Sequence, residues 1–240
     1  EPSEKSFCVD MLIVGAGFGG ICMGIKAKGA GLNVVILERA GDIGGTWREN
    51  VYPGCACDTR SHHYSFSFFM KSDWSRRFAG HAEILEYLHN AVDAFGLRND
   101  IHLKQTVRAL HFDEDSSFWS VKTESGATYR ARFVVSAVGQ LNQPAWPDIP
   151  GLETFSGKRM HSATWDTSYD LKGKTLAVIG NGASAVQLIP EVAKKTKYLT
   201  VFQRSPNWVV ERNDRAFREI EKTLFRWIPF WAWLYRSYFY

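Results

Sequence analysis

The chain has 240 residues, of which 45% are hydrophobic and 22% are charged. That balance is typical of a folded protein with a buried core and excludes a disordered chain. The formal net charge is only +4, and because the basic residues form no long run, the sequence does not indicate a nucleic-acid partner. The length allows one large domain or two modest ones.

The four cysteines, Cys8, Cys22, Cys55 and Cys57, form no C-x-x-C pair, and no second cluster completes a zinc site. The Cys55-x-Cys57 spacing could mark a redox pair, but we favour two small side chains in a tight loop. The first residues are polar and lack an apolar signal core, and no run of about 18 apolar residues suits a membrane span. These features predict a cytoplasmic protein in a reducing compartment, without a bound metal.

The first recognisable unit is a strand, a glycine loop, a helix and a second strand. A strand over residues 11–14 runs into Gly15-Ala-Gly17-Phe-Gly19-Gly20, followed by a helix over 21–28 and a strand over 34–37. In this context a G-x-G-x-x-G pattern indicates dinucleotide binding. The first glycine permits the tight turn, the second lets the backbone approach a pyrophosphate, and the third, Gly19 or Gly20, lets the helix pack close to the strand. The N-terminus of the helix offers N–H groups to the phosphates.

Glu38 follows the second strand of this unit. A carboxylate at that position accepts hydrogen bonds from a ribose 2′-OH and repels a 2′-phosphate. The first loop is therefore predicted to bind FAD or NAD rather than NADP.

The middle of the chain begins with a long segment, residues 40–80, that is rich in Gly, Trp, Tyr, His and Phe. Loops of that length inside a compact domain are usually functional. Residues 82–95 have the apolar spacing of a helix. Alternating residues then predict a β-meander and a buried strand, over 102–107, 119–123, 128–133 and 133–138.

A second glycine loop follows a proline-rich passage at 144–150. A strand over 176–179, the loop Gly180-Asn-Gly182-Ala-Ser-Ala185, a helix over 185–195 and a strand over 199–202 repeat the first pattern. Here Arg204 follows the second strand in place of the acid, between Gln203 and Ser205. A guanidinium matches the oxygens of a phosphate, so this loop is predicted to bind NADPH.

The residues predicted to contact the ribose have opposite charges in the two loops, a carboxylate in the first and a guanidinium in the second. This difference implies two different nucleotides, and the simplest chemistry is hydride transfer from NADPH to a bound flavin. We therefore expect an α/β fold, a Rossmann-like two-dinucleotide-binding flavoprotein with three-layer ββα/βαβ domains. The predicted division is an FAD-binding domain over 1–143, a linker over 144–170 and the N-terminal part of an NADPH-binding domain over 171–240.

Between the two loops lies Phe155-Ser-Gly157-Lys-Arg-Met-His161-Ser-Ala-Thr-Trp165-Asp166. This segment resembles the F-x-G-x-x-x-H-x-x-x-W-(P/D) fingerprint of type I Baeyer–Villiger monooxygenases, and it is far more specific than either glycine loop. The related flavin-containing monooxygenases that oxidise amines and sulfides usually carry another aromatic residue at its end. Trp165 therefore favours the Baeyer–Villiger branch.

Two further segments are similar to the same family: Gly44-Gly45-Thr46-Trp47 with Tyr52 to Asp58, and Val138-Gly139-Gln140. The resemblance implies which residues contact each nucleotide. For FAD these are Gly15, Gly17, Phe18, Gly20, Glu38, Thr46, Trp47, Asp58, Tyr64, Val107 and Gln140. For NADPH they are Ala56, Cys57, Ile179, Gly180, Asn181, Gly182, Ala183, Ser184, Ala185, Gln203, Arg204 and Ser205.

The resemblance also implies a reaction. In the family NADPH reduces FAD, O₂ adds to give a C4a-peroxyflavin, and the peroxide attacks a ketone to yield an ester or lactone. An N- or S-oxygenating flavin monooxygenase is the alternative enzyme, and an inactive nucleotide-binding fragment is the alternative from another class. The expected partners are a small ketone and O₂, and the sequence leaves the oligomeric state open.

Asp58 and His161 are the two candidate catalytic residues. A carboxylate at Asp58 could orient a cationic partner or tune the field of the flavin, whereas the simpler interpretation is a turn-capping aspartate. His161 could act as an acid–base group, but a lone histidine more often has a structural role. We favour a positional role for it in the linker, with Trp165 as a packing anchor.

The chain is much shorter than members of that family, so we expect it to be the front half of a longer protein, without the strands that complete both domains. The segment Phe225–Tyr240 is unusually aromatic. It could be an interfacial membrane helix, but we favour a buried helix whose covering domain is missing. Either interpretation predicts an exposed apolar patch.

Overall fold

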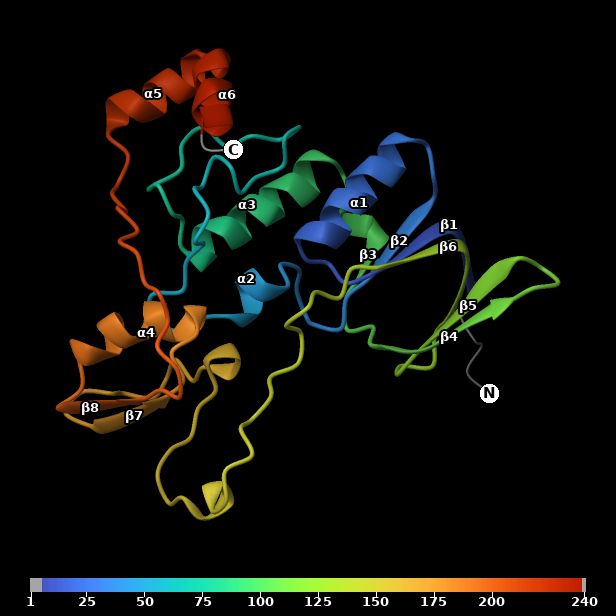
Figure 1. The fold of residues 1–240 in the computed structure, drawn as a ribbon. Helices are drawn as coiled ribbons and strands as arrows, with labels where there is room; N and C mark the ends of the chain where they lie inside the picture. The colour runs from blue at the N-terminus through green and yellow to red at the C-terminus, as the bar shows by residue number, and fades with distance from the viewer. Residues whose placement is uncertain (1–5, 239–240) are drawn as a thin grey trace. The chain divides into compact units, whose positions relative to one another are not determined.

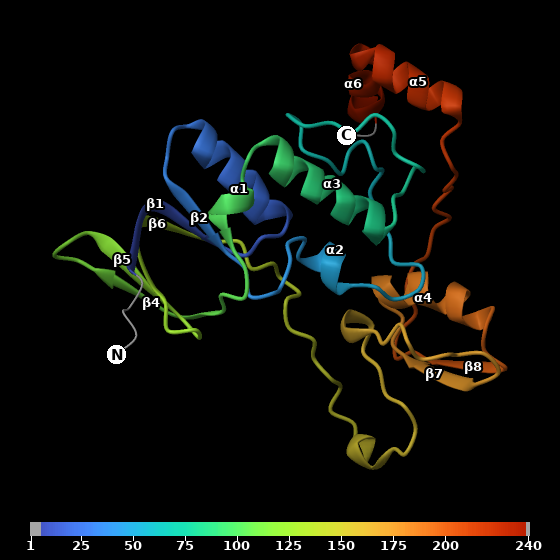
Figure 2. The ribbon, with the colours of Figure 1, turned by 180° about the vertical axis from the view of Figure 1, so that it is seen from behind.

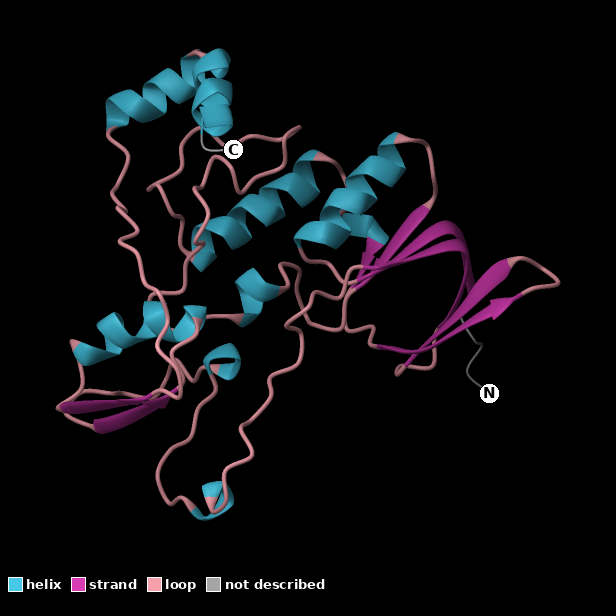
Figure 3. Ribbon diagram, in the orientation of Figure 1, coloured by secondary structure: helices cyan, strands magenta, loops and turns pink. Residues whose placement is uncertain are grey.

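A computed structural model describes residues 6–238 and divides the chain into two compact units. The first unit combines the residues up to Arg48 with Leu85–Asn142, and the second combines Glu49–Ile84 with the residues from Gln143 onward. Figures 1 and 2 show the ribbon from opposite sides, and Figure 3 shows how much of the second unit is loop. Residues 49–84 thus belong to the same unit as the second glycine loop, although they follow the first one in the sequence.

The first unit is built on one mixed sheet with strand order β3-β2-β1-β6-β5-β4. Its centre is parallel, because β1 pairs in parallel with both β2 and β6, whereas β6, β5 and β4 form an antiparallel meander. In chain order the elements up to β6 are β1 (Ser6–Val14), α1 (Phe18–Gly29), β2 (Val34–Leu37), α2 (Thr46–Glu49), α3 (His81–Ala94), η1 (Arg98–Asp100), β3 (Ile101–His102), β4 (Val107–Asp113), β5 (Phe118–Thr123) and β6 (Thr128–Ser136). The last residue of α2 and the first four of α3 fall in the second unit.

The core of this unit follows from the strand sequences. All four residues of β2 are buried, as expected for a central parallel strand with both faces covered. One face of the sheet carries a cluster that includes Leu12, Val121 and Tyr129. Helix α1 covers the other face so closely that a Cβ added to Gly24 would lie 2.7 Å from Ile36 Cδ1.

The predicted strand over 102–107 is wrong. Strand β3 is only two residues long and pairs in parallel with the end of β2. The chain then turns at Lys104, which has a φ of 57°, and the N–H groups of Lys104 and Gln105 donate to Ala40 O and Glu38 O. The first strand of the meander is β4, which begins only at Val107.

The strands predicted separately over 128–133 and 133–138 are one strand, β6. Its first residues, 128–131, pair with β5 on one edge, while β1 pairs with it from Thr128 to Ser136 on the other. The sequence pattern changes at Phe133 from alternating residues to a continuous apolar run, but the strand continues through this change. Helix α1 likewise begins at Phe18 rather than at Ile21.

The second unit contains a two-stranded parallel sheet and one helix in the predicted order. Strand β7 (Thr175–Ile179) pairs in register with β8 (Tyr198–Phe202), and α4 (Ala183–Ala193) connects them. Most residues of both strands are exposed. Two short 3₁₀ turns, η2 (Leu152–Thr154) and η3 (Ser162–Thr164), interrupt the linker, and a small core of Tyr52, Cys55, Leu171, Leu188 and Val192 holds the unit together.

The aromatic C-terminal segment forms parts of two helices, α5 (Glu219–Trp227) and α6 (Pro229–Tyr238), and its last two residues lie outside the described part of the chain. The paired interaction of Arg215 with Glu221, at 2.6 and 2.7 Å, anchors the start of α5 and lowers the pKa of Glu221 to about 2. No helix among the described residues has the length and apolar character needed to cross a membrane.

These two helices pack on the loop of residues 60–78 within the second unit. The Arg236 guanidinium donates to the carbonyl oxygens of His62 and Ser65, each at 3.1 Å. The His62 ring is buried among Phe217, Phe225 and Tyr235. Neither of its ring nitrogens has a hydrogen-bond partner in the described structure, and burial lowers the pKa of His62 to about 4.

Candidate functional site

The first glycine loop has the backbone that its sequence predicts. Gly15 adopts a φ of +105°, and a Cβ added there would lie 2.6 Å from Ala137 O. Both the turn and the neighbouring β6 segment therefore exclude a side chain. A Cβ on Gly20 would lie 1.8 Å from Gly15 O, whereas one on Gly19 would come no closer than 4.0 Å to Ala137 Cβ. Gly20, not Gly19, is thus the glycine that lets helix and strand approach.

The start of α1 is open to an anion. Gly17 is the N-cap and supplies no side-chain hydrogen bond, and the first backbone bond of the helix runs from Ile21 N to Gly17 O at 3.0 Å. The N–H groups of the first turn therefore have no acceptor within the helix. Together with the helix dipole they form the phosphate-binding geometry of dinucleotide loops.

Glu38 is buried at the mouth of this loop. Its Oε2 accepts from Ala16 N at 2.8 Å, and its Oε1 accepts from Ala40 N at 2.9 Å. The carboxylate therefore also holds the glycine loop in place, a role that the sequence did not indicate. Each oxygen keeps a second lone pair, so acceptor capacity for a ribose hydroxyl remains.

The predicted flavin loop lies against the glycine loop. Gly44 N donates to Ala16 O at 2.9 Å, and a Cβ on Gly45 would lie 3.1 Å from Gly17 Cα. Trp47 is buried, whereas Thr46, its neighbour on α2, is exposed. These contacts bring two segments of the predicted FAD site together at the carboxyl ends of β1 and β2, where open α/β sheets bind ligands.

The remaining predicted FAD residues are distributed over both units. Phe18 stacks on Tyr87 with ring centroids 6.0 Å apart. Gln140 is exposed just after β6, and Val107 starts β4, half-buried against the core. Asp58 and Tyr64 belong to the second unit.

The second glycine loop reproduces the first almost bond for bond. Gly180 has a φ of +103° and donates to Phe202 O at 2.8 Å, as Gly15 donates to Leu37 O at the same distance. The first helical bond, from Val186 N to Gly182 O, is again 3.0 Å. Unlike Gly15, Gly180 has no atom within 4 Å of an added Cβ, because no strand of the described structure pairs with β7 on its second side.

Side-chain amides organise the end of this loop that is predicted to contact the ribose. Asn181 Nδ2 donates to Gln203 Oε1 at 3.1 Å and to Ser205 O at 2.7 Å, and Asn207 Nδ2 donates to Asn181 O. Arg204 is exposed, and its guanidinium has no partner among the described residues. Glu38 and Arg204, the two residues predicted to contact a ribose, therefore differ in environment as well as in charge, since Glu38 is buried and hydrogen-bonded while Arg204 is exposed. Nothing in the sequence indicated the role of Asn207.

The segment from Tyr52 to Asp58 is fastened to α4 by Gln187, which sequence reasoning missed. The Gln187 carboxamide bonds to the side chains of Tyr52 and Asp58 and to both backbone groups of Ala56. Its only signal in the sequence is an amide one turn into an otherwise apolar stretch of helix.

Cys55 and Cys57 lie buried in this same segment, and burial raises the pKa of both thiols. A protonated thiol is a poor nucleophile. The favoured interpretation of the two cysteines as small packing side chains is consistent with this environment.

The fingerprint segment lies in the second unit. His161 Nδ1 accepts from Ala163 N at 3.1 Å and caps η3, so the proton of a neutral His161 ring lies on Nε2. Trp165 packs against the core that contains Tyr52. Asp166 bonds to Lys158 Nζ at 2.7 Å and to Ser168, interactions that lower its pKa to about 2.

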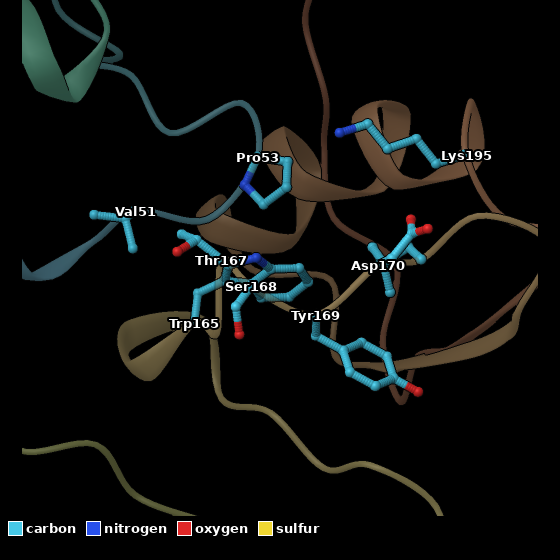
Figure 4. Close-up of a pocket in the computed structure, with 9 residues that line it drawn as sticks. Val51, Pro53, Trp165, Thr167, Ser168, Tyr169, Asp170 and Lys195 are labelled. Carbon is cyan, nitrogen blue, oxygen red and sulfur yellow. The ribbon is translucent and has the colours of Figure 1, made fainter.

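A cavity of about 430 Å³ lies beside Trp165. Figure 4 shows its lining residues, which come from the loop before Cys55, from the end of the fingerprint and the residues after it, and from the turn that follows α4. They are Val51, Pro53, Trp165, Thr167, Ser168, Tyr169, Asp170, Leu171 and Lys195. Among the described residues no cluster of His, Cys, Asp or Glu could hold a metal ion.

Comparison with known proteins identifies relatives across nearly the whole chain. A Baeyer–Villiger monooxygenase of Streptomyces coelicolor is 47% identical over 92% of this chain, which corresponds to 43% of the relative. A phenazine N-monooxygenase of Lysobacter antibioticus is 39% identical over 88% of this chain and 40% of the relative. The NADP⁺-bound crystal structure of cyclohexanone monooxygenase from Rhodococcus sp. Phi1 superposes with a TM-score of 0.84, at 38% identity, over 92% of this chain and 44% of that one.

The chain thus spans less than half the length of the curated relatives it matches. The superposition confirms the predicted Rossmann-like α/β flavoprotein fold. The family model described as pyridine nucleotide-disulphide oxidoreductase matches residues 12–218. On that match the chain belongs to the pyridine nucleotide-disulphide oxidoreductase family, with Baeyer–Villiger monooxygenases among its relatives.

Proposed function

We propose that this chain is the FAD- and NADPH-binding part of a flavoprotein monooxygenase that uses O₂ to convert a ketone to an ester or lactone. One observation carries the proposal: two glycine loops of the same geometry end in opposite ribose readers, Glu38 and Arg204, with the fingerprint 155–166 between them. The Baeyer–Villiger relative and the NADP⁺-bound cyclohexanone monooxygenase agree with it.

The residues of the first unit fit FAD. The Gly15–Gly20 loop and the start of α1 would hold the pyrophosphate, and the spare lone pairs of Glu38 would accept from the ribose hydroxyls. The accessible Thr46 and Gln140 would contact the flavin end. The residues from Ile179 to Ala185 and Gln203 to Ser205 would hold NADPH in the same manner, with Arg204 on the 2′-phosphate.

When both nucleotides are bound, NADPH supplies a hydride and FAD supplies the oxygen-activating chemistry. The chain's own residues contribute binding and orientation. Asp58 presents an exposed carboxylate beside Ala56 and Cys57, which are predicted to contact NADPH. His161 holds the linker by capping η3, so we assign it a positional role. A cytoplasmic location is part of the proposal, supported by four free cysteines.

The substrate class separates two candidate functions. Trp165 at the end of the fingerprint favours ketone oxidation, whereas the phenazine N-monooxygenase relative keeps oxygenation at nitrogen as the second candidate. The assay supplies the chain with FAD and NADPH and offers an aryl ketone, a tertiary amine and a thioether, with products identified by mass spectrometry. We expect the ester of the ketone. N-oxide or sulfoxide without any ester would reject ketone oxidation, and neither flavin retention nor NADPH oxidation would favour a nucleotide-binding fragment.

Arg204 gives a direct test of the nucleotide assignment. Arg204→Gln removes a charge-assisted contact worth about 1.5–3 kcal/mol, so the Kd for NADPH should rise about 10- to 100-fold. The Kd for NADH, which has no 2′-phosphate, should stay within about twofold of its value in the unchanged chain. Binding is measured by nucleotide fluorescence, with Lys172→Gln as a control that removes an exposed positive charge elsewhere on the second unit. Equal losses for both nucleotides would reject the assignment of Arg204.

A further inference from the structure

The most fully satisfied polar side chain near the predicted nucleotide residues is Gln187. Its Oε1 accepts from Tyr52 Oη at 2.9 Å and from Ala56 N at 3.2 Å. Its Nε2 donates to Ala56 O at 2.9 Å and to Asp58 Oδ1 at 2.6 Å. All four hydrogen-bonding positions of the carboxamide are therefore used.

This arrangement admits only one orientation of the carboxamide. Rotating it by 180° would place the NH₂ group against the Ala56 N–H and the oxygen against Ala56 O and the Asp58 carboxylate. Donor would then face donor and acceptor would face acceptor. Burial raises the pKa of Tyr52 to about 12, so its hydroxyl remains a donor to Gln187 throughout the physiological range.

The segment 52–58 also lies tightly on the backbone of α4. A Cβ added to Gly54 would lie 2.6 Å from Gln187 O. Tyr52 and Cys55 are buried in the same core as Leu188 and Val192 of α4. The segment is therefore held by packing on α4 at Gln187 and beyond it, and the amide fixes its position along the helix.

Asp58, by contrast, is exposed, and Gln187 Nε2 is the one hydrogen-bond donor to its carboxylate among the described residues. A free aspartate side chain would sample several rotamers. The hydrogen bond from Gln187 Nε2, at 2.6 Å, stabilises one of these rotamers. Gln187 lies one turn after Ser184, so the residue that orients Asp58 belongs to the helix that begins at the predicted NADPH loop.

From these contacts we infer that Gln187 is a positioning residue, which orients the Asp58 carboxylate and ties the segment 52–58 to the NADPH-binding helix α4. The inference rests on the proposed function, since Asp58 is a predicted catalytic residue and Ala56 and Cys57 are predicted NADPH contacts. Its consequence is that occupancy of the NADPH loop and the orientation of Asp58 are linked through one side chain.

Two substitutions separate positioning from simple packing. Gln187→Leu keeps the bulk and removes all four hydrogen bonds. Gln187→Glu keeps both acceptor contacts but places a carboxylate against Asp58. Two carboxylates at that distance cannot both be charged without cost, so the pKa of one of them rises. The repulsion between the introduced carboxylate and Asp58 must then increase as the pH rises from about 5.5 to about 8, and with it the loss of order in the segment 52–58.

The first measurement is amide hydrogen exchange of the ligand-free chain over residues 52–58, expressed as protection factors. We expect Gln187→Leu to lower protection at Ala56 about tenfold at every pH, which corresponds to the loss of one or two net hydrogen bonds. The protonated carboxyl of Gln187→Glu has one O–H donor where the amide has two, so this variant should lose only about threefold protection near pH ~5.5 and about tenfold by pH ~8. When Gln187→Glu is combined with Asp58→Asn, the asparagine amide can donate to the introduced carboxylate, and the dependence on pH should disappear.

Val186→Glu is the matched control, because it adds a carboxylate to the neighbouring, partly exposed position of α4 and should leave exchange over 52–58 unchanged. A pH-independent effect of Gln187→Glu, or no recovery in the double variant, would overturn the inference.

The second measurement is the Kd for NADPH, which Gln187→Leu should raise about tenfold. If the unchanged chain binds NADPH and Gln187→Leu binds it equally well, the link to the nucleotide is rejected. If the unchanged chain does not bind NADPH at all, the proposed function fails, while the exchange results still decide the role of Gln187.

Discussion

Gly20→Ala is expected to cost about 2 kcal/mol of the free energy of unfolding and to raise the Kd for FAD about 100-fold. The added Cβ would lie 1.8 Å from Gly15 O, so the backbone of either the loop or the helix must move. Such overpacking costs about 3 kcal/mol, against which alanine in a helix gains only about 1 kcal/mol. The displaced loop would also weaken about two charge-assisted hydrogen bonds to the pyrophosphate, which accounts for the loss of affinity.

Two other glycines of α1 provide matched controls. A Cβ on Gly19 meets nothing closer than 4.0 Å, so Gly19→Ala should keep the helix-propensity gain of about 1 kcal/mol. A Cβ on Gly24 would lie 2.7 Å from Ile36 Cδ1, the end of a side chain that can rotate away, so Gly24→Ala should be close to neutral. Urea unfolding of the flavin-free chain and FAD titration measure the two effects. Equal stability for Gly19→Ala and Gly20→Ala would show that the loop tolerates the shift.

The parts of the fold that were predictable depend on short-range patterns. Strand, glycine loop, helix and strand each leave a local signal, and this order of signals predicted both glycine loops. The sequence could not choose between Gly19 and Gly20, because both stand beside the same turn. The choice depends on which Cβ would point at Gly15 O, and only the packing of α1 against the strand decides that.

The parts that were missed depend on contacts between distant segments. Gln187 meets Tyr52 and Ala56 across more than one hundred residues, and neither the amide nor the loop has a pattern that predicts its partner. Strand β3 was missed for a related reason. A two-residue strand has no periodicity of its own, and it exists because β2 offers a free edge.

The aromatic C-terminal segment has one feature that its local sequence predicts and another that depends on contacts with a distant segment. Its composition predicted an apolar helix, and it does form helix, but Pro229 begins a new one. Phe225 is buried against His62, whereas Trp227 and Phe230 are exposed. The expected exposed apolar patch is therefore present, and one face of the helix pair is covered by the loop 60–78, a contact that composition could not indicate.

That covered face makes His62 a group whose protonation should lower the stability of the second unit. The pKa of His62 is about 4 in the folded chain and 6.5 in an ordinary environment. Because the folded value is lowered, the unfolded chain takes up the proton first as the pH falls. Stability is therefore complete above pH 6.5 and decreases until the pH passes about 4. A separation of this size corresponds to about 3 kcal/mol.

The charged groups around His62 also oppose its protonation in the folded chain. Arg236 bonds to its backbone carbonyl, Arg60 bonds to the hydroxyl of Tyr235, and Arg215 lies over the ring of Phe217. A protonated His62 would add a cation among three guanidinium groups. Glu221, which pairs with Arg215, has a pKa of about 2 and cannot neutralise the region by changing its charge between pH 4 and 6.5.

His62→Phe tests this prediction, because a phenyl ring suits the apolar surroundings and cannot take up a proton. At pH ~7.5 we expect a gain of about 1 kcal/mol in the free energy of unfolding, since two unbonded ring nitrogens are removed from the core. Between pH ~6.5 and ~4.5, urea midpoints of the unchanged chain should fall much more steeply than those of the variant. Parallel curves would mean that His62 is protonated in the folded chain at its ordinary pKa, and that the helix pair opens readily enough to hydrate it.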